Sequence, residues 1–469
     1  MNQEPRMRKV AMDERFIQTV SETGTHTARC GSPVQGKQMT YKKMLQAAMA
    51  VGLSAAIGLG LAACSRDYTA AYVYSVSASN GSISAFGVDY QTGILTQING
   101  SPFSSGLATV TTIVPGPSGQ YLYVIGGPQD ASVVAIARGT DGKLYNQKTY
   151  SLGGGTYPTA AAVDSTGTYL YVTFTYQVGF TVASPGPGGI AIFKISSTDG
   201  TLTGPVVENG LNYVPVGSNP VSIAVSVPTC GTTASVPSAP PCTGTSSKTF
   251  SNTFVYVVDQ EASPNGTVLG FAQNSSDGTL TPLSGTTFNT TLQTYQGYHA
   301  GVTPSAVAVD PTGRFVYVTD KTSNQIIGYT IDTNGTGNLT AMLSSPFGTG
   351  LYPVALTIEP RGKYLYTANY NDSSVSSFAI DAGSGSLSSV AGSGGFKTGA
   401  QPTCVTVEPE LGIYLYTSNY LEGTISGGRL NANTGALSGV DQSPFDASAL
   451  PACITSVTNG PHALQINQP

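Results

Sequence analysis

The sequence predicts an all-β protein, a seven-bladed β-propeller built from four-stranded antiparallel blades. Composition is the first observation: 57 Gly, 29 Pro, no Trp and only 10% charged residues favour an exported protein rich in strands and turns. A repeat of 49 residues in the last third of the chain is the second. The third is the alternation of apolar and polar residues within each copy, which is typical of strands.

Residues 1–63 are predicted to be a leader that ends in a lipoprotein signal peptide. Lys42 and Lys43 precede an uncharged run, residues 44–63, and Cys64 follows Leu-Ala-Ala, an arrangement similar to the bacterial lipobox. We therefore expect the leader to be removed, Cys64 to carry a lipid, and residues 64–69 to form a tether. A single transmembrane anchor is the alternative, and Met39 is an alternative start.

The two parts of the chain differ in charge. Residues 1–63 hold eight Lys/Arg and four Asp/Glu, whereas the remainder has a formal charge of −9. A negative surface repels phosphate backbones, so we expect no nucleic-acid binding. The predicted location is the bacterial cell envelope, periplasmic or surface-exposed, with a monomer held to the membrane by the lipid on Cys64.

Each copy of the repeat reads as four strands. In the copy that starts at Pro304, the predicted strands are residues 306–309, 315–318, 326–331 and 339–343. A Pro-x-Gly turn separates the first two, and Asp, Asn and Gly precede the last. A four-stranded unit of 40–50 residues is the sequence signature of a propeller blade.

The number of copies gives seven blades. Copies start at Val110, Pro158, Pro220, Pro304, Pro353 and Pro402, with another first strand at Pro451. The unit at residues 71–98 lacks a first strand, and residues 451–457 have only that strand. The last strand should therefore complete the first blade and leave no open edge. The propeller would span residues 70–460, with a tail at 461–469; six or eight blades are the alternatives.

These blades resemble those of the lactonase-type seven-bladed propellers, which include bacterial 6-phosphogluconolactonase and the Tyr-Val-Thr-Asn repeat proteins. The resemblance rests on residues 311–320, residues 364–369 and the turn at 335–339, and it covers about residues 70–460. It implies the fold, and it implies opening of a lactone ring by His and Arg side chains around the central channel.

Four cysteines of the predicted propeller suggest two disulfides. Cys230 and Cys242 flank a Pro/Ser/Thr-rich insertion in the fourth blade, and a bridge would close a short loop there. Cys404 and Cys453 each lie two residues after the proline of a first strand, in the last and first blades, so a bridge would lock the ring. Free thiols are the alternative. No histidine lies at ligand spacing from them, and we expect no metal and no cofactor.

His299 is the candidate catalytic residue. It lies five residues before Pro304, in a connection between blades that we expect near the mouth of the channel. It could act as the general base that activates water for ring opening. The alternative is a loop histidine packed among tyrosines.

Four polar residues recur three positions after the tyrosine of the second strand, and they are a candidate binding ring. They are Asp259, Asp320, Asn369 and Asn419. Such a ring could bind a ligand or a cation. Capping of backbone groups at the strand end is the alternative.

Two functions remain open from the sequence. The first is a non-catalytic envelope protein whose rigid face binds a protein, a glycan or a small molecule. The second is a lactonase that uses His299 at the channel. The first strands are preceded by Tyr157, Asn219, Thr303, Tyr352 and Gln401 rather than by histidine, which favours the binding protein.

Overall fold

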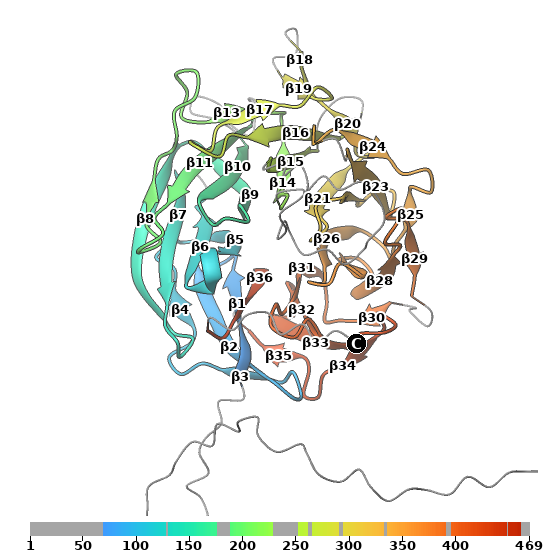
Figure 1. The fold of residues 1–469 in the computed structure, drawn as a ribbon. Coiled ribbons are helices and arrows are strands. Elements are labelled where there is room, and N and C mark those ends of the chain that lie inside the picture. The colour runs from blue at the N-terminus through green and yellow to red at the C-terminus, as the bar shows by residue number, and fades with distance from the viewer. Residues whose placement is uncertain are drawn as a thin grey trace, which may run out of the picture. The chain divides into compact units, whose positions relative to one another are not determined.

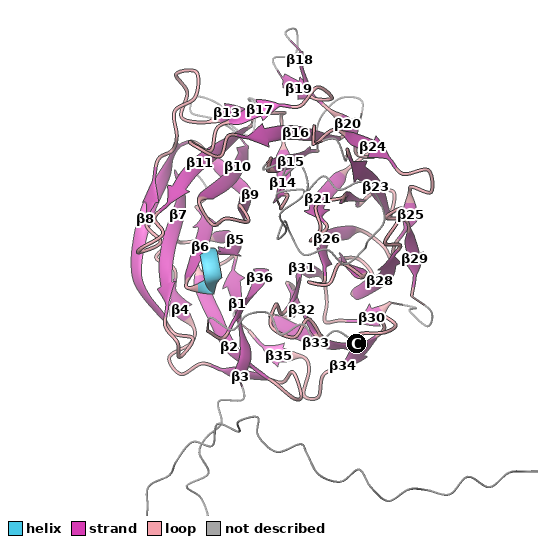
Figure 2. Cartoon of the chain, viewed as in Figure 1, coloured by secondary structure: helices cyan, strands magenta, loops and turns pink. Residues whose placement is uncertain are grey.

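The computed structural model describes residues 69–127, 130–175, 188–227, 252–260, 265–289, 294–332, 335–390, 395–447 and 449–460. The predicted leader, Cys64, the tail, and the pair Cys230 and Cys242 lie outside these residues. Seven antiparallel sheets form a ring (Figure 1), so the predicted fold is confirmed. The described secondary structure is strand apart from one 3₁₀ turn, η1 (Pro117–Gly119) (Figure 2). Among the described residues, no helix has the length and apolar character needed to cross a membrane.

Each blade, numbered 1 to 7 along the chain, has four strands in order from the first, nearest the axis, to the fourth, on the outside. The first strands, in blade order, are β36 (Pro451–Thr458), β5 (Val110–Pro115), β9 (Tyr157–Val163), β14 (Pro220–Val225), β21 (Pro304–Val309), β26 (Pro353–Ile358) and β31 (Pro402–Val407). The second strands are β1 (Thr69–Ser77), β6 (Tyr121–Gly126), β10 (Tyr169–Thr175), β15 (Phe254–Asp259), β22 (Phe315–Asp320), β27 (Tyr364–Asn369) and β32 (Tyr414–Asn419). The third strands are β2 (Ser82–Asp89), β7 (Asp130–Arg138), β11 (Gly189–Ile195), β16 (Thr267–Gln273), β23 (Gln325–Ile331), β28 (Ser374–Ile380) and β33 (Thr424–Leu430). The fourth strands are β3 (Leu95–Gln97), β8 (Leu144–Gly154), β12 (Leu202–Thr203), β17 (Leu280–Pro282), β24 (Leu339–Ala341), β29 (Leu387–Ser389) and β34 (Leu437–Gly439).

Short strands add to six of the blades by pairing with the start of the third strand. They are β4 (Phe103–Ser104), β13 (Val214–Pro215), β20 (Tyr298–His299), β25 (Phe347–Gly348), β30 (Phe396–Lys397) and β35 (Phe445–Asp446). A separate hairpin, β18 (Thr287–Asn289) and β19 (Thr294–Gln296), projects beyond blade 4 (Figure 1). In blade 2 the long β8 pairs along the whole of β7 instead.

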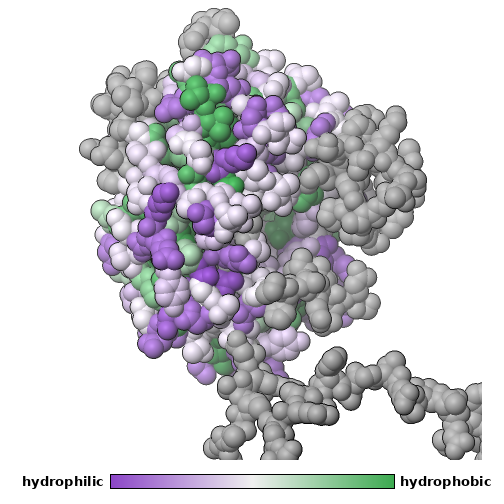
Figure 3. All heavy atoms as spheres, turned by 60° about the vertical axis from the view of Figure 1, so that its left-hand side comes forward, coloured by the Kyte–Doolittle hydropathy of each residue, from purple (hydrophilic) through white to green (hydrophobic). Residues whose placement is uncertain are grey.

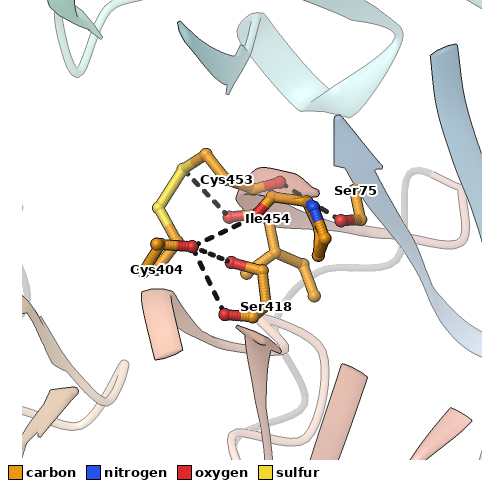
Figure 4. The surroundings of a disulfide bond; sticks show 7 residues. Ser75, Cys404, Ser418, Cys453 and Ile454 are labelled. Carbon is orange, nitrogen blue, oxygen red and sulfur yellow. Dashed lines mark hydrogen bonds between the residues drawn. A yellow bond between two sulfur atoms is a disulfide. The ribbon is translucent and has the colours of Figure 1, made fainter. Parts of the chain in front are cut away.

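The ring closes as the sequence predicts. The C-terminal strand β36 pairs with β1 from Ala71 to Ser77, so the two ends of the propeller complete one blade. Cys404 of β31 and Cys453 of β36 form a disulfide with a Cα–Cα distance of 5.0 Å (Figure 4). The bridge joins the first strands of blades 7 and 1, at the point of closure.

Tyrosines of the second strands hold neighbouring blades together. Each is buried, and its hydroxyl donates to the carbonyl of a glycine in the turn between the third and fourth strands of the next blade. The seven pairs are Tyr74–Gly142, Tyr123–Gly200, Tyr171–Gly278, Tyr256–Gly337, Tyr317–Gly385, Tyr366–Gly435 and Tyr416–Gly93, with O–O distances of 2.7–3.1 Å. We call each pair a tyrosine–glycine latch. The tyrosines are therefore part of the framework of the ring.

Alternation of strand direction gives the ring two faces. The first strands begin at the upper face, where the second strands end and the third strands begin. The turns after the first and third strands lie at the lower face. The side of the ring around β7 and β8 is covered by hydrophilic and intermediate residues, with hydrophobic residues in separate patches (Figure 3).

Candidate functional site

The predicted binding ring is buried in the fold. Asp259, Asp320, Asn369 and Asn419 are each at most 1% exposed, at the ends of the second strands on the upper face. Ser77, Gly126 and Phe174 take this position, three residues after the tyrosine, in blades 1 to 3. Asp or Asn therefore occupies this position in four of the seven blades.

The two aspartates bind the segment that leads into the first strand of their own blade. Asp320 accepts the backbone N–H groups of Val302 and Thr303 at 2.9 and 3.0 Å. Asp259 accepts those of Ser218 and Asn219 at 3.2 and 2.7 Å. A carboxylate that accepts backbone N–H groups in this way caps the chain, so these contacts favour the structural alternative.

The two asparagines also connect to a backbone N–H group, but through the hydroxyl group of a serine. The Asn369 amide donates to Ser376 Oγ at 2.9 Å, and that oxygen accepts the N–H of Gly350 at 3.0 Å. In blade 7, Asn419 donates to Ser426 Oγ, which accepts the N–H of Gly399, both at 2.9 Å. A ligand-binding role for the four residues stays a prediction, and their contacts within the chain account for their burial.

His299 lies away from the axis, in β20 on the outer part of blade 4. It pairs with Thr267 of the third strand β16, and its side chain is exposed. Its Nδ1 accepts the N–H of Gly301 at 3.3 Å. The sequence places this residue near the mouth of the channel, but the additional pairing with β16 holds it at the periphery.

The arginines lie at the opposite end of the blades from His299. Residues 70–460 contain one histidine and four arginines. Arg314 and Arg361 are in turns between first and second strands, and Arg138 and Arg429 are near the ends of third strands, so all four are at the lower face. Arg361 forms a buried ion pair with Glu359 at 2.8 Å, and Arg314 donates to the Ala382 carbonyl at 2.6 Å. The fold therefore does not bring His299 together with an arginine.

The wall nearest the axis is uncharged. None of the seven first strands, all within the described residues, contains Asp, Glu, Lys, Arg or His. Hydroxyls link these strands instead: Thr159 donates to the Pro220 carbonyl, Ser305 to that of Pro353 and Thr403 to that of Pro451, at 2.5, 2.7 and 3.1 Å. In the described part of the chain, no group of three His, Cys, Asp or Glu residues could hold a metal ion.

In four of the seven blades, the turn after the first strand buries an acid at the lower face. These acids are Asp164, Asp310, Glu359 and Glu408, and Glu408 is the most distinctive of them. Its carboxylate accepts the N–H groups of Glu410, Leu411 and Ile413 at 2.8–2.9 Å. Burial raises the pKa of Glu408 from 4.5 to about 7, against the opposing effect of these hydrogen bonds. No pattern in the sequence indicates this shift, because it depends on how deeply the folded chain buries the carboxyl group.

Glu408 should make stability depend on pH. The folded state binds its proton more tightly than the unfolded state does, so its contribution is complete below about pH 4.5 and is lost as pH rises through about 7. We compare the native chain with Glu408→Gln, a variant that cannot titrate at this position. The difference between their unfolding free energies should change by about 3 kcal/mol across this pH range, against the native chain. Urea unfolding at several pH values measures it, with Glu359→Gln as the matched variant in blade 6. A constant difference would contradict the prediction.

Side chains that emerge at the upper face of blades 5 to 7 form a candidate binding surface. We call this surface the upper rim, and it consists of Val302, Lys321, Leu351, Tyr352, Tyr370, Gln401 and Leu421. The Lys321 ammonium lies 5.6 Å from the centre of the Tyr352 ring, and the Tyr352 and Tyr370 rings are 6.1 Å apart. The Tyr370 hydroxyl donates to Gln401 Oε1 at 2.8 Å. These contacts connect three blades.

The upper rim differs from an ordinary loop surface in its apolar residues. Val302, Leu351 and Leu421 are 55%, 51% and 62% exposed, although they are aliphatic. Tyr352 and Gln401 have φ of 60° and 59°, and Leu450, at the same position before Pro451, has φ of 50°. This left-handed conformation, uncommon for residues with a side chain, therefore belongs to the repeat in three neighbouring blades.

Comparisons with known proteins agree with the fold. Residues 234–407 match the family described as lactonase, 7-bladed beta-propeller, so the resemblance seen in the sequence is confirmed. A candidate 6-phosphogluconolactonase from Bacteroides uniformis is 18% identical with a TM-score of 0.58, and the match covers 83% of this chain and 100% of that one. The periplasmic gluconolactonase PpgL of Pseudomonas aeruginosa is 16% identical with a TM-score of 0.59, covering 83% and 99%. At these identities the likeness concerns the fold alone. No curated protein matches the sequence.

Proposed function

We propose that this chain, a propeller of the lactonase type, is a lipid-anchored binding protein of the bacterial envelope that holds a protein or peptide segment on its upper rim. The anchor is the lipid expected on Cys64. The observation that carries the proposal is the run of contacts from Lys321 through Tyr352 and Tyr370 to Gln401, flanked by exposed aliphatic residues.

The chemistry of the upper rim favours a peptide over a glycan. Tyrosine rings with their positions fixed by neighbours lose little conformational entropy on binding, and they are enriched at protein interfaces. Exposed Leu351 and Leu421 would gain by burial against apolar side chains, whereas a hydroxyl-rich glycan offers them little. The amide of Gln401 and the ammonium of Lys321 supply polar contacts at the edge.

Lactone hydrolysis is the second candidate, because the family includes lactonases. Ring opening needs a base and groups that stabilise the developing oxyanion. His299 lies at the periphery of the upper face and the four arginines at the lower face, and this separation argues against the reaction. A panel of phosphorylated and plain lactones, assayed with the purified full chain and with His299→Ala, tests it. Turnover that His299→Ala abolishes would make the protein a hydrolase.

Peptide selection tests the upper rim directly. A random peptide library displayed on phage, selected against the purified full chain, should yield binders that compete for one surface. Tyr352→Gly and Leu351→Ser should weaken these binders by about tenfold or more, as expected for anchors at the centre of an interface. Glycine suits the left-handed backbone at residue 352, so the first variant should leave the fold intact.

The control is Leu343→Ser, which removes a fully exposed leucine from the connection that follows β24. It should leave the selected peptides bound as before. Failure to enrich any peptide, or enrichment of peptides that are insensitive to Tyr352→Gly and Leu351→Ser, would count against a protein-binding function for the rim.

A further inference from the structure

A pocket of about 390 Å³ opens between blades 4 and 5, on the outer part of the ring. Its walls come from β20, β23 and β24 and from the connection that follows β24. The lining residues are Tyr298, His299, Gln325, Ile327, Tyr329, Ala341, Met342, Ser345 and Pro346. Its volume lies within the range of small-molecule sites, and a mostly apolar lining with a few polar groups is typical of them.

The short strand on the blade 4 side of the pocket departs from the repeat. In blades 1, 5, 6 and 7 the residue equivalent to Tyr298 is a phenylalanine. The equivalent pairs are Phe103–Ser104, Phe347–Gly348, Phe396–Lys397 and Phe445–Asp446. His299 takes a position that is Ser, Gly, Lys or Asp in these four blades and Pro215 in blade 3, so the fold does not require a histidine there.

The blade 5 side departs from the repeat as well. Tyr329 lies on β23, one residue after the partner of the second-strand tyrosine. The equivalent residues of four other blades are phenylalanines, namely Phe86, Phe193, Phe271 and Phe378. The first residue of the third strand is Gln325, where the five other blades that share this pairing have Ser82, Gly189, Thr267, Ser374 or Thr424. Two tyrosines, Tyr298 and Tyr329, therefore face this pocket where most other blades have phenylalanine, and His299 and Gln325 are larger side chains than their equivalents in most blades.

Hydrogen bonds fix the two tyrosines of the pocket and set the tautomer of the neutral His299 ring. The Tyr329 hydroxyl donates to the His299 carbonyl, and the Tyr298 hydroxyl donates to Asn338 Oδ1 at 2.9 Å, so both tyrosines are fixed. Because His299 Nδ1 accepts the Gly301 N–H, the neutral ring carries its proton on Nε2. His299 is then a hydrogen-bond donor at the edge of an apolar pocket.

We propose that this pocket is a binding site for a small uncharged molecule that has an apolar ring and a carbonyl oxygen. The ring would pack against Tyr298, Tyr329 and Met342, and the carbonyl would accept a hydrogen bond from His299 Nε2. A carboxylate fits poorly, because none of the lining residues is a lysine or an arginine. The site is separate from the upper rim and does not depend on the function proposed for it.

The probe for this site is 1-tetralone, a stable bicyclic ketone. Titration calorimetry or ligand-observed NMR with the purified full chain should show saturable binding. Tetralin, which lacks the carbonyl, should bind about tenfold more weakly, the loss expected for one hydrogen bond in an apolar pocket. The anion 1,2,3,4-tetrahydro-1-naphthoate should bind more weakly than tetralone.

Variants locate the binding. His299→Gly, which gives β20 the residue found at Gly348, should weaken tetralone about tenfold and remove its advantage over tetralin. Ala341→Trp, at the exposed edge of the pocket, should abolish binding by occlusion. Lys397→Gly makes the equivalent change in blade 6 and should have no effect. The proposal is overturned if tetralone shows no saturable binding or if its affinity is the same in both pocket variants as in the unchanged protein. It is also overturned if the anion binds more tightly than tetralone.

Discussion

Replacing Gly435 with alanine is expected to lower the free energy of unfolding by about 3 kcal/mol or more. Gly435 has a φ of 74°, a conformation in which an L side chain costs about 1–2 kcal/mol. A Cβ there would also lie 2.3 Å from Cδ1 of the Tyr364 ring, and relief of such overpacking costs about 1–3 kcal/mol. The same residue accepts the Tyr366 hydroxyl, so a shift of the turn would break a tyrosine–glycine latch.

The matched control is Gly439→Ala in the same blade. A Cβ at Gly439 meets no atom within 4 Å, and its φ is not positive. Urea unfolding of both variants should show a large shift for Gly435→Ala and almost none for Gly439→Ala. A double-mutant cycle with Tyr366→Phe should show coupling, because both changes act on one latch. Equal stability of the two glycine variants would contradict the assigned contact.

The seven latches show what the sequence could and could not reveal. The tyrosines of the second strands and the glycines of the turns are visible in the repeat, and the structure confirms that both belong to the framework. Their pairing is not visible, because Tyr366 bonds to Gly435 of the next copy, 69 residues away. Only the packing of one blade against the next brings them together.

The fold was predictable because the repeat is regular in its polarity and its turns. The start positions at Pro304, Pro353, Pro402 and Pro451 fix four first strands, and the structure begins a strand at each. The incomplete first unit and the isolated last strand also predict closure between β36 and β1. The spacing of the copies is enough to predict the strand positions and the closure, because a four-stranded blade buries its apolar faces in the same way in each copy.

The candidate site was less predictable than the fold, because neighbouring residues at the end of a strand differ in how far their side chains are exposed to solvent. Asp320 is fully buried, whereas Lys321, the next residue, emerges at the upper rim. Alternation of side chains along a strand does not tell where the strand ends. His299 shows a second limit: β20 is only two residues long, and no periodic signal marks so short a strand at the periphery.

Loss of the Cys404–Cys453 disulfide is expected to lower stability by about 4 kcal/mol. The bridge closes a loop with a sequence separation of 49 residues, and the chain-entropy model gives about 4 kcal/mol for a loop of this size. The effect should be local as well as global. β36 is the strand that completes blade 1, and in the doubly substituted variant Cys404→Ser with Cys453→Ser only hydrogen bonds and packing hold it in the ring.

Two measurements separate these contributions. Thermal or urea unfolding gives the loss of stability, and hydrogen exchange should show faster exchange in β36 and β1 than in blades 3 to 6, because opening would begin where the ring closes. The double variant Cys230→Ser with Cys242→Ser is the control, because its predicted loop is short and falls in the sequence between β14 and β15 rather than in the strands that close the ring. If the Cys404–Cys453 variant keeps its stability and the slow exchange of β36, strand pairing alone closes the ring and the disulfide is dispensable. If β36 exchanges rapidly while blades 3 to 6 remain protected, the disulfide is what keeps the last strand in place.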